Sequence, residues 1–147
     1  MSDFPVTPRR LSLHDCAAAE AQGHRWIESE KAGQDLGEAA VRDWVRHHWS
    51  RFLRGRWIEH LEGRIFWIEL DRGDFGLLQR QFRDSEVLEE ILRRLRGGGE
   101  NLDILGWSLD RLLPEGRHGE VLEILEALDI NGHRVEPCLG PHLSVAG

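Results

Sequence analysis

The chain has 147 residues, of which 40% are hydrophobic and 31% charged, a balance that predicts one folded domain and excludes a disordered chain. Its longest purely apolar runs are four residues, whereas a membrane span needs about 20, so we expect no transmembrane segment and no membrane partner. The first ten residues lack an apolar signal core and the two cysteines are far apart, so we expect a cytoplasmic protein.

The charge of the chain is uneven. Lys and Arg number 19 against 26 Asp and Glu, and the net charge of −7 disfavours contact with nucleic acid and with anionic membranes. Residues 1–96 hold 16 basic and 17 acidic side chains, whereas residues 97–147 hold three basic and nine acidic ones. The C-terminal third is therefore the acidic part, and its charge suits a basic partner.

Helix signals divide most of the chain. Residues 1–10 are expected to form a flexible tail, residues 11–136 a single globular domain and residues 137–147 a second tail. Apolar spacing, N-cap residues and glycines predict about five helices and one short helical piece. The first helix runs from Ser12 to Gly33, and the second from 36, with Asp35 as its N-cap, to Gly63 with a break at Gly55. The short piece covers 77–82. The remaining helices run from Ser85 to Gly97, over 101–113 and over 120–128.

Two segments favour strands. Residues 64–70 are short and rich in β-branched and aromatic side chains, and Asn131-Gly132 is typical of a hairpin turn that leads into a second strand at 133–136. We therefore predict an α+β fold that is predominantly helical, with a small two- or three-stranded antiparallel sheet. The first strand is expected to turn Phe66, Ile68 and Leu70 toward the helices, and Glu69 toward solvent.

Leucines dominate the segment 101–113. Their spacing predicts a helix that turns all of them toward the core. They are Leu102, Leu105, Leu109, Leu112 and Leu113.

Two predicted helices carry polar side chains on their apolar faces. Glu20, His24 and Glu28 lie on or beside that face of the first helix, and His48 lies within the apolar arc of the second. Because the link between the helices is short, we expect them to pack antiparallel, with His24 facing His48 and a glutamate one turn away on either side. Such residues either form a buried polar cluster that fixes the packing or bind a metal such as zinc or iron. We favour the polar cluster and expect no metal or other cofactor.

The second predicted helix also has a basic face. Tryptophans interleave with arginines over residues 42–57, a combination that suits phosphate contacts and base stacking. One hypothesis is therefore a nucleic-acid-associated accessory protein that binds through Arg46, Arg51, Arg54 and Arg56. The net charge opposes this hypothesis, and an ordinary solvated face explains the same pattern.

The sequence contains no motif that specifies a reaction. It has no phosphate-binding loop, no nucleophile elbow and no zinc-protease motif, so we do not expect an enzyme. We expect instead a non-catalytic binding or adaptor module that acts through protein–protein contacts, with another protein or a second copy of itself as partner. Six Trp and the acidic C-terminal third support this prediction. Reversing the charge of Glu120, Glu123 and Glu126 is expected to weaken partner binding.

Overall fold

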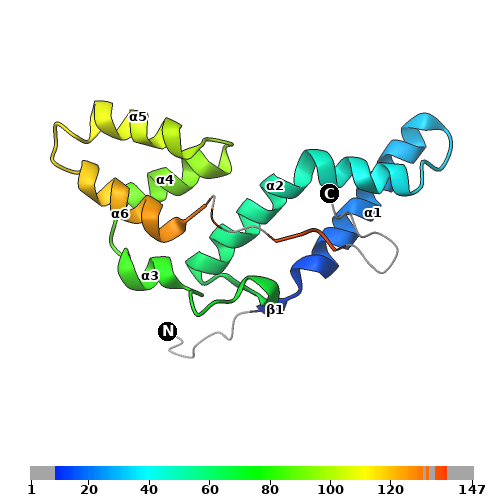
Figure 1. Ribbon diagram of the computed structural model, residues 1–147, viewed down its shortest axis with the longest axis horizontal. Helices are drawn as coiled ribbons and strands as arrows, with labels where there is room; N and C mark the ends of the chain where they lie inside the picture. Colours follow the sequence, from blue (N-terminus) through cyan, green and yellow to red (C-terminus); the bar gives the residue numbers. More distant parts are fainter. Residues whose placement is uncertain (1–8, 131, 133–134, 139–147) are drawn as a thin grey trace, which may run out of the picture.

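The computed structural model describes residues 9–130, 132 and 135–138 (Figure 1). The described elements are six α-helices, one 3₁₀-helix and two short strands, so the predicted α+β, predominantly helical class is confirmed. In chain order they are β1 (Arg9–Leu11), α1 (Leu13–Ala32), α2 (Glu38–Glu62), β2 (Ile65–Trp67), η1 (Ile68–Leu70), α3 (Leu77–Gln81), α4 (Glu86–Arg96), α5 (Asn101–Arg111) and α6 (His118–Leu128). Among these helices, none combines the length and the apolar character needed to cross a bilayer.

Helices α1 and α2 form a long hairpin. The predicted start and end of α1 are confirmed, because Ser12 caps its first turn and Gly33 ends it in the left-handed conformation. Asp35 does not cap α2 as predicted, since the N-cap is Gly37. The Asp35 carboxylate instead accepts the Gly37 N–H at 2.9 Å and two hydrogen bonds from Arg25 at 2.7 and 3.0 Å. These bonds tie the turn to α1, and the bonds from Arg25 are the main reason that the pKa of Asp35 falls to about 2.

Helix α2 runs without the predicted break at Gly55. It covers 25 residues and ends at Gly63, as expected from the glycine there. An interior glycine costs a helix only about 1 kcal/mol relative to alanine. Burial of Leu53, Trp57 and Ile58, each at most 8% exposed, outweighs that cost.

The predicted antiparallel sheet is wrong, because β1 and β2 pair in parallel. Arg9 lies opposite Ile65, and Leu11 opposite Trp67. The chain leaves β1 along α1 and returns along α2, and Gly63, with φ of 76°, reverses it again (Figure 1). Strand β2 therefore leaves in the same direction as β1.

The position of β1 also corrects the predicted N-terminal tail, which included residues 9 and 10. The predicted partner strand at 133–136 lies partly outside the described residues. Val135 and Glu136, which are described, are not in a strand. The Val135 carbonyl instead accepts a hydrogen bond from the Trp49 indole of α2 at 3.0 Å.

The inward face predicted for residues 64–70 is only partly correct. The chain leaves the extended conformation at Ile68, where η1 begins, so the alternation of a strand ends there. Trp67 and Leu70 are buried at 3% and 1% exposure, whereas Ile68 is 52% exposed. A 3₁₀ turn has three residues per turn, and this period brings residues 67 and 70 to the same side.

Glu69 does not face solvent as predicted. Its carboxylate accepts the Ser12 hydroxyl at 2.6 Å and the Leu13 N–H at 2.5 Å, at the start of α1. Burial disfavours ionisation of Glu69, but these hydrogen bonds outweigh it and hold the pKa of Glu69 below its usual range. Glu69 thereby links η1 to the positive end of the α1 dipole.

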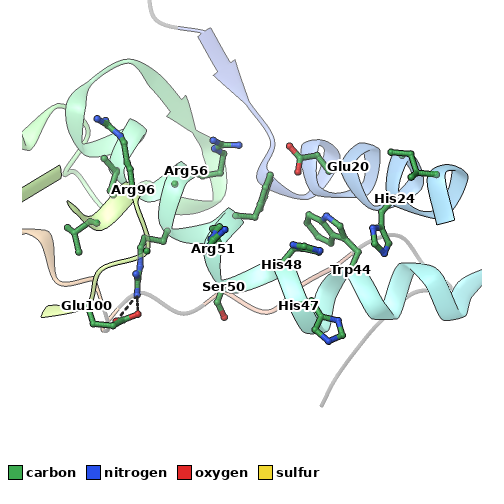
Figure 2. A pocket seen from close by; sticks show the side chains of 18 residues that line it. Glu20, His24, Trp44, His47, His48, Ser50, Arg51, Arg56, Arg96 and Glu100 are labelled. Atoms are coloured by element: carbon green, nitrogen blue, oxygen red, sulfur yellow. Dashed lines mark hydrogen bonds and ion pairs between the residues drawn. The ribbon is translucent and has the colours of Figure 1, made fainter. Parts of the chain in front are cut away.

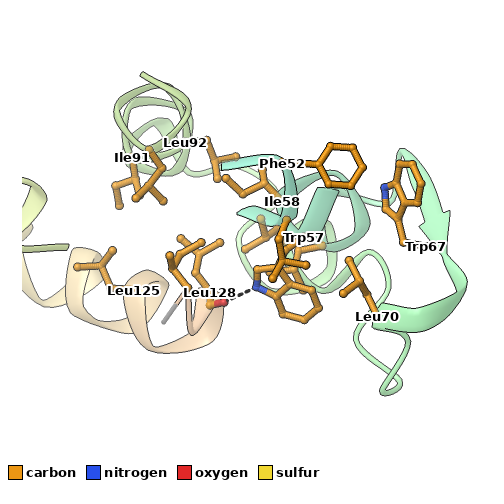
Figure 3. Close-up of a cluster of buried hydrophobic side chains, with 14 of the residues drawn as sticks. Phe52, Trp57, Ile58, Trp67, Leu70, Ile91, Leu92, Leu125 and Leu128 are labelled. Carbon is orange, nitrogen blue, oxygen red and sulfur yellow. Dashed lines mark hydrogen bonds between the residues drawn. The ribbon is translucent and has the colours of Figure 1, made fainter. Parts of the chain in front are cut away.

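A single hydrophobic core joins the two ends of the fold (Figure 3). Trp57 of α2 is 2% exposed, and its indole N–H donates to the Leu128 carbonyl of α6 at 2.7 Å. Helix α6 packs against both α4 and α5. Ile91 of α4 and Ile124 of α6 are fully buried in the same core. Helix α5 is therefore the outer layer of this helical end of the molecule.

Candidate functional site

Helix α5 turns a row of leucines to the surface. It lies at the edge of the molecule (Figure 1). Leu102 is 81% exposed, Leu109 is 51% exposed and, just beyond the helix, Leu113 is 54% exposed. The neighbouring α6 adds Leu122, which is 47% exposed. We call these four side chains the leucine face.

The predicted inward orientation of this segment is therefore wrong for Leu102, Leu109 and Leu113, and Leu105 is only half-buried. The side chains that face the core are Ile104 at 0%, Ser108 at 0% and Leu112 at 8% exposure. At about 100° per residue, the centres of the two rows lie roughly 120° apart around the helix. Both rows have helical spacing, so periodicity alone does not decide which one is covered.

Contacts with three neighbouring elements hold α5 in place. They are an ion pair of Arg54 with both carboxylate oxygens of Glu100 at 3.0 and 3.1 Å, the Arg94 guanidinium over the Trp107 ring at 4.4 Å, and a hydrogen bond between Ser108 and His118 at 2.7 Å. The leucine face thus belongs to a helix anchored near both ends and along its length.

Exposed acidic side chains lie on the same elements as the leucine face. The exposed acids of α5, α6 and the turn between them are Asp103, Asp110, Glu115, Glu123 and Glu126. The arginines of the same region have acidic neighbours, since Arg111 lies 3.3 Å from Asp110 and Arg117 lies 3.7 Å from Glu120. Glu120 also accepts the Ser85 hydroxyl at 2.5 Å. Of Glu120, Glu123 and Glu126, the three glutamates predicted to meet a partner, Glu120 is the one that these contacts with Arg117 and Ser85 hold within the fold.

A groove lies on another part of the surface, between α1, α2 and the end of α4 (Figure 2). Its volume is about 830 Å³. Three of the four arginines proposed for nucleic-acid contact line it, namely Arg51, Arg54 and Arg56. Arg46 is exposed on α2 but does not line the groove, whereas Arg96 of α4, which the sequence pattern missed, does.

Carboxylates neutralise most of these groove arginines. Besides the Arg54–Glu100 pair, Arg56 pairs with Glu59 and Arg96 pairs with Glu62. Within the described part of the chain, Arg51 has no ion-pair partner. Its side chain lines the groove (Figure 2), and its guanidinium lies 3.5 Å from the position that a Cβ would take at Gly98.

The predicted meeting of His24 and His48 is present in the structure. Their ring centroids lie 5.6 Å apart in an edge-to-face arrangement. His24 also donates to Asp43 at 3.0 Å, and this hydrogen bond is the main reason that the pKa of Asp43 is lowered. Asp43 was not among the residues predicted for this cluster. Asp43 also contacts His47, and the spacing of four residues between them was a usable signal.

The two glutamates predicted beside this pair are not part of a buried cluster. Glu20 and His48 are exposed, and Glu20 lines the same groove. Glu28 instead lies 3.4 Å from the Lys31 ammonium. The alternative of a metal bound by His24 and His48 is not tested by the structure. Among the described residues, no third metal-ligating atom completes a group of three within 4.8 Å there.

One group of three ligand types is close enough for a metal, namely His60, Asp71 and Asp74 among the described residues. The Trp67 N–H donates to Nδ1 of His60 at 3.1 Å, so the proton of the neutral ring is on Nε2, which lies 3.3 Å from Asp74. A histidine that binds a metal through one ring nitrogen normally donates a hydrogen bond from the other. In His60 the nitrogen that faces the carboxylates is Nε2, and the other, Nδ1, accepts a hydrogen bond instead of donating one. His60 therefore fits a link between α2, β2 and the following turn better than it fits a metal ligand.

Comparisons with protein-family models, with curated proteins and with solved structures find no match for this chain. The class of protein is therefore inferred from the leucine face and the groove themselves.

Proposed function

We propose that this chain is a non-catalytic protein-binding module that docks a partner on the leucine face. The observation that carries the proposal is the exposure of four leucines, between 47% and 81%, on two adjoining helices. Single exposed apolar residues are common on protein surfaces, but a row of them rimmed by polar residues is typical of a protein-binding site.

The energetics favour a covered state of this face. Burying a leucine that is fully exposed contributes about 1.5–3 kcal/mol, and Leu102 alone leaves 81% of its surface in water. Because α5 is held by Arg54, Arg94 and His118, a partner meets a formed surface and does not have to order the helix.

Site-specific photo-crosslinking in the cells of origin tests this proposal. A photoreactive phenylalanine analogue replaces Leu109 in one variant and Ile68 in the other. The two positions are matched in exposure, at 51% and 52%, and Ile68 lies on η1, outside the leucine face. We expect a discrete protein adduct from position 109 and none from position 68. Equal adducts from both positions, or none from position 109, would contradict the proposal.

A second candidate function is association with nucleic acid through the groove. The observation that favours it is the position of Arg51, which lines the groove together with three further arginines (Figure 2). Guanidinium groups in a groove bind phosphates and stack on bases. The test is titration of a single-stranded oligonucleotide at several salt concentrations. Arg51→Ala should weaken binding and lower the salt dependence, whereas Arg46→Ala, outside the groove, should not. Absence of binding at low salt would exclude this candidate.

A further inference from the structure

The acids of α5 follow the leucine row along one side. At about 100° per residue, Asp103 and Asp110 lie roughly 80–100° around the helix from Leu102. They are seven residues apart, or about 10 Å along the axis at 1.5 Å per residue. Both are exposed, as are Glu123 and Glu126 on the neighbouring α6. A helix that lies on the leucines therefore passes beside Asp103 and Asp110, the second of which also lies 3.3 Å from the Arg111 guanidinium.

A second copy of this chain fits this surface poorly in the antiparallel arrangement. If α5 pairs antiparallel with α5 of another copy, with the centre of the pairing between Gly106 and Trp107, Asp103 of one copy lies at the level of Asp110 of the other, and the acidic flanks lie on the same side of the contact. This arrangement brings like charges together, which destabilises the pair.

The backbone of α5 is accessible at the middle of the row. Gly106 is exposed, and apart from its chain neighbours and the nearby backbone of α5 no atom lies within 4 Å of the position that a Cβ would take there. From Leu102 to Leu113 the row is about 17 Å long at the helical rise of 1.5 Å per residue. A partner helix of about 12 residues or more covers this length.

We propose that the leucine face takes a basic amphipathic helix of another protein, and this inference rests on the protein-binding function proposed above. The apolar side of the partner helix covers Leu102, Leu109 and Leu113. Lys or Arg side chains at its flank, spaced by about seven residues to match one side of a helix, meet Asp103 and Asp110. The acidic excess of the C-terminal third then increases the rate of association with this partner.

Two synthetic helical peptides test the chemistry of the partner. They share the same leucine positions, and one carries Lys and the other Glu at the flanking positions. Binding to the full chain is followed by fluorescence anisotropy at low and high salt. We expect the Lys peptide to bind, its affinity to fall with salt, and the Glu peptide to bind about tenfold more weakly or worse.

Matched variants of the chain locate the site. Leu102→Ser with Leu109→Ser should abolish binding of the Lys peptide, whereas Ile68→Ser should not. The pair Asp103→Asn and Asp110→Asn should remove most of the preference for Lys over Glu, and Asn keeps the oxygen with which Asp103 accepts the Glu100 N–H. An exposed acidic pair elsewhere, Asp84→Asn with Glu89→Gln, is the control for overall charge.

The outcomes separate this inference from the proposed function. Equal binding of the two peptides, or no binding of either, overturns the basic partner but leaves the crosslinking test of the module unaffected. A dimer in sedimentation that Leu102→Ser with Leu109→Ser dissociates makes a second copy the occupant, which also overturns it. Loss of peptide binding in the Ile68→Ser control as well as in the leucine variant shows that binding does not depend on the leucine face in particular, which overturns it as well.

Discussion

The orientation of α5 can be tested by stability alone, without a partner. We compare Leu102→Ala and Ile104→Ala, two truncations that lie two positions apart on the same helix. Leu102 is 81% exposed, whereas Ile104 is 0% exposed and belongs to the core. The two residues lose a similar apolar volume, and alanine favours the helix in both cases. A difference in stability between the variants therefore reports burial.

The expected magnitudes differ widely. Truncation of a fully buried isoleucine to alanine costs about 2–5 kcal/mol, because transfer energy is lost and a cavity remains. Truncation of an exposed leucine stays within about 0.5 kcal/mol of wild type. In a domain of this size each kcal/mol shifts the melting temperature by about 2–4 °C, so Ile104→Ala should lower it by roughly 4–20 °C and Leu102→Ala by at most about 2 °C.

Urea denaturation followed by circular dichroism and by tryptophan fluorescence measures both variants. Ile104→Ala should lower the midpoint without changing the slope of the transition, which would show a change in stability and not in compactness. A loss of more than about 1.5 kcal/mol in Leu102→Ala, or of less than about 1 kcal/mol in Ile104→Ala, would refute the assigned orientation. The leucine face would then be part of the core, and both the proposed function and the partner would fall with it.

Three further predictions follow from named contacts. Because the folded pKa of Glu69 is lowered, its ionised form stabilises the fold above the unfolded pKa, and this stability is lost as the pH falls through the folded pKa. Glu69→Gln should therefore flatten the acid side of a plot of unfolding free energy against pH, and exposed Glu30→Gln should not. Trp57→Phe should cost at least about 1–3 kcal/mol in urea denaturation, since the buried Leu128 carbonyl loses its donor at 2.7 Å; an unchanged midpoint would exclude this role for the hydrogen bond. His60 should not bind zinc, because its Nδ1 accepts the Trp67 N–H. Calorimetric titration with zinc should therefore give the same result for the wild-type protein and for His60→Asn.

Local sequence signals predicted most of the helices well. Ser12 and Ser85 cap helices as expected, since each hydroxyl accepts a backbone N–H three residues on, at 3.3 and 3.1 Å. The short turn before α2 likewise predicted an antiparallel hairpin, and with it the contact of His24 with His48. These features depend on residues close in the chain or on one short connection, so the pattern of the sequence contains them.

The sheet and the candidate site depended on distant parts of the chain. The parallel pairing of β2 with β1 joins residues more than 50 positions apart and requires the whole α1–α2 hairpin to lie between them. The tie from Glu69 to Ser12 spans 57 positions in the same way. No local pattern distinguishes this partner from the strand at 133–136 that Asn131-Gly132 suggested.

The sequence by itself predicted a leucine-rich helix over 101–113, of which Asn101–Arg111 is helical, and an acidic C-terminal third. Only the tertiary structure decided which side of α5 is covered. The helix has two apolar rows, and α6 packs against just one side of it, with Ile104 and Ser108 buried and Leu102 left in water. A hydrophobic row is equally apolar whether it meets its own core or a partner, so its position relative to the other helices decides which of the two covers it.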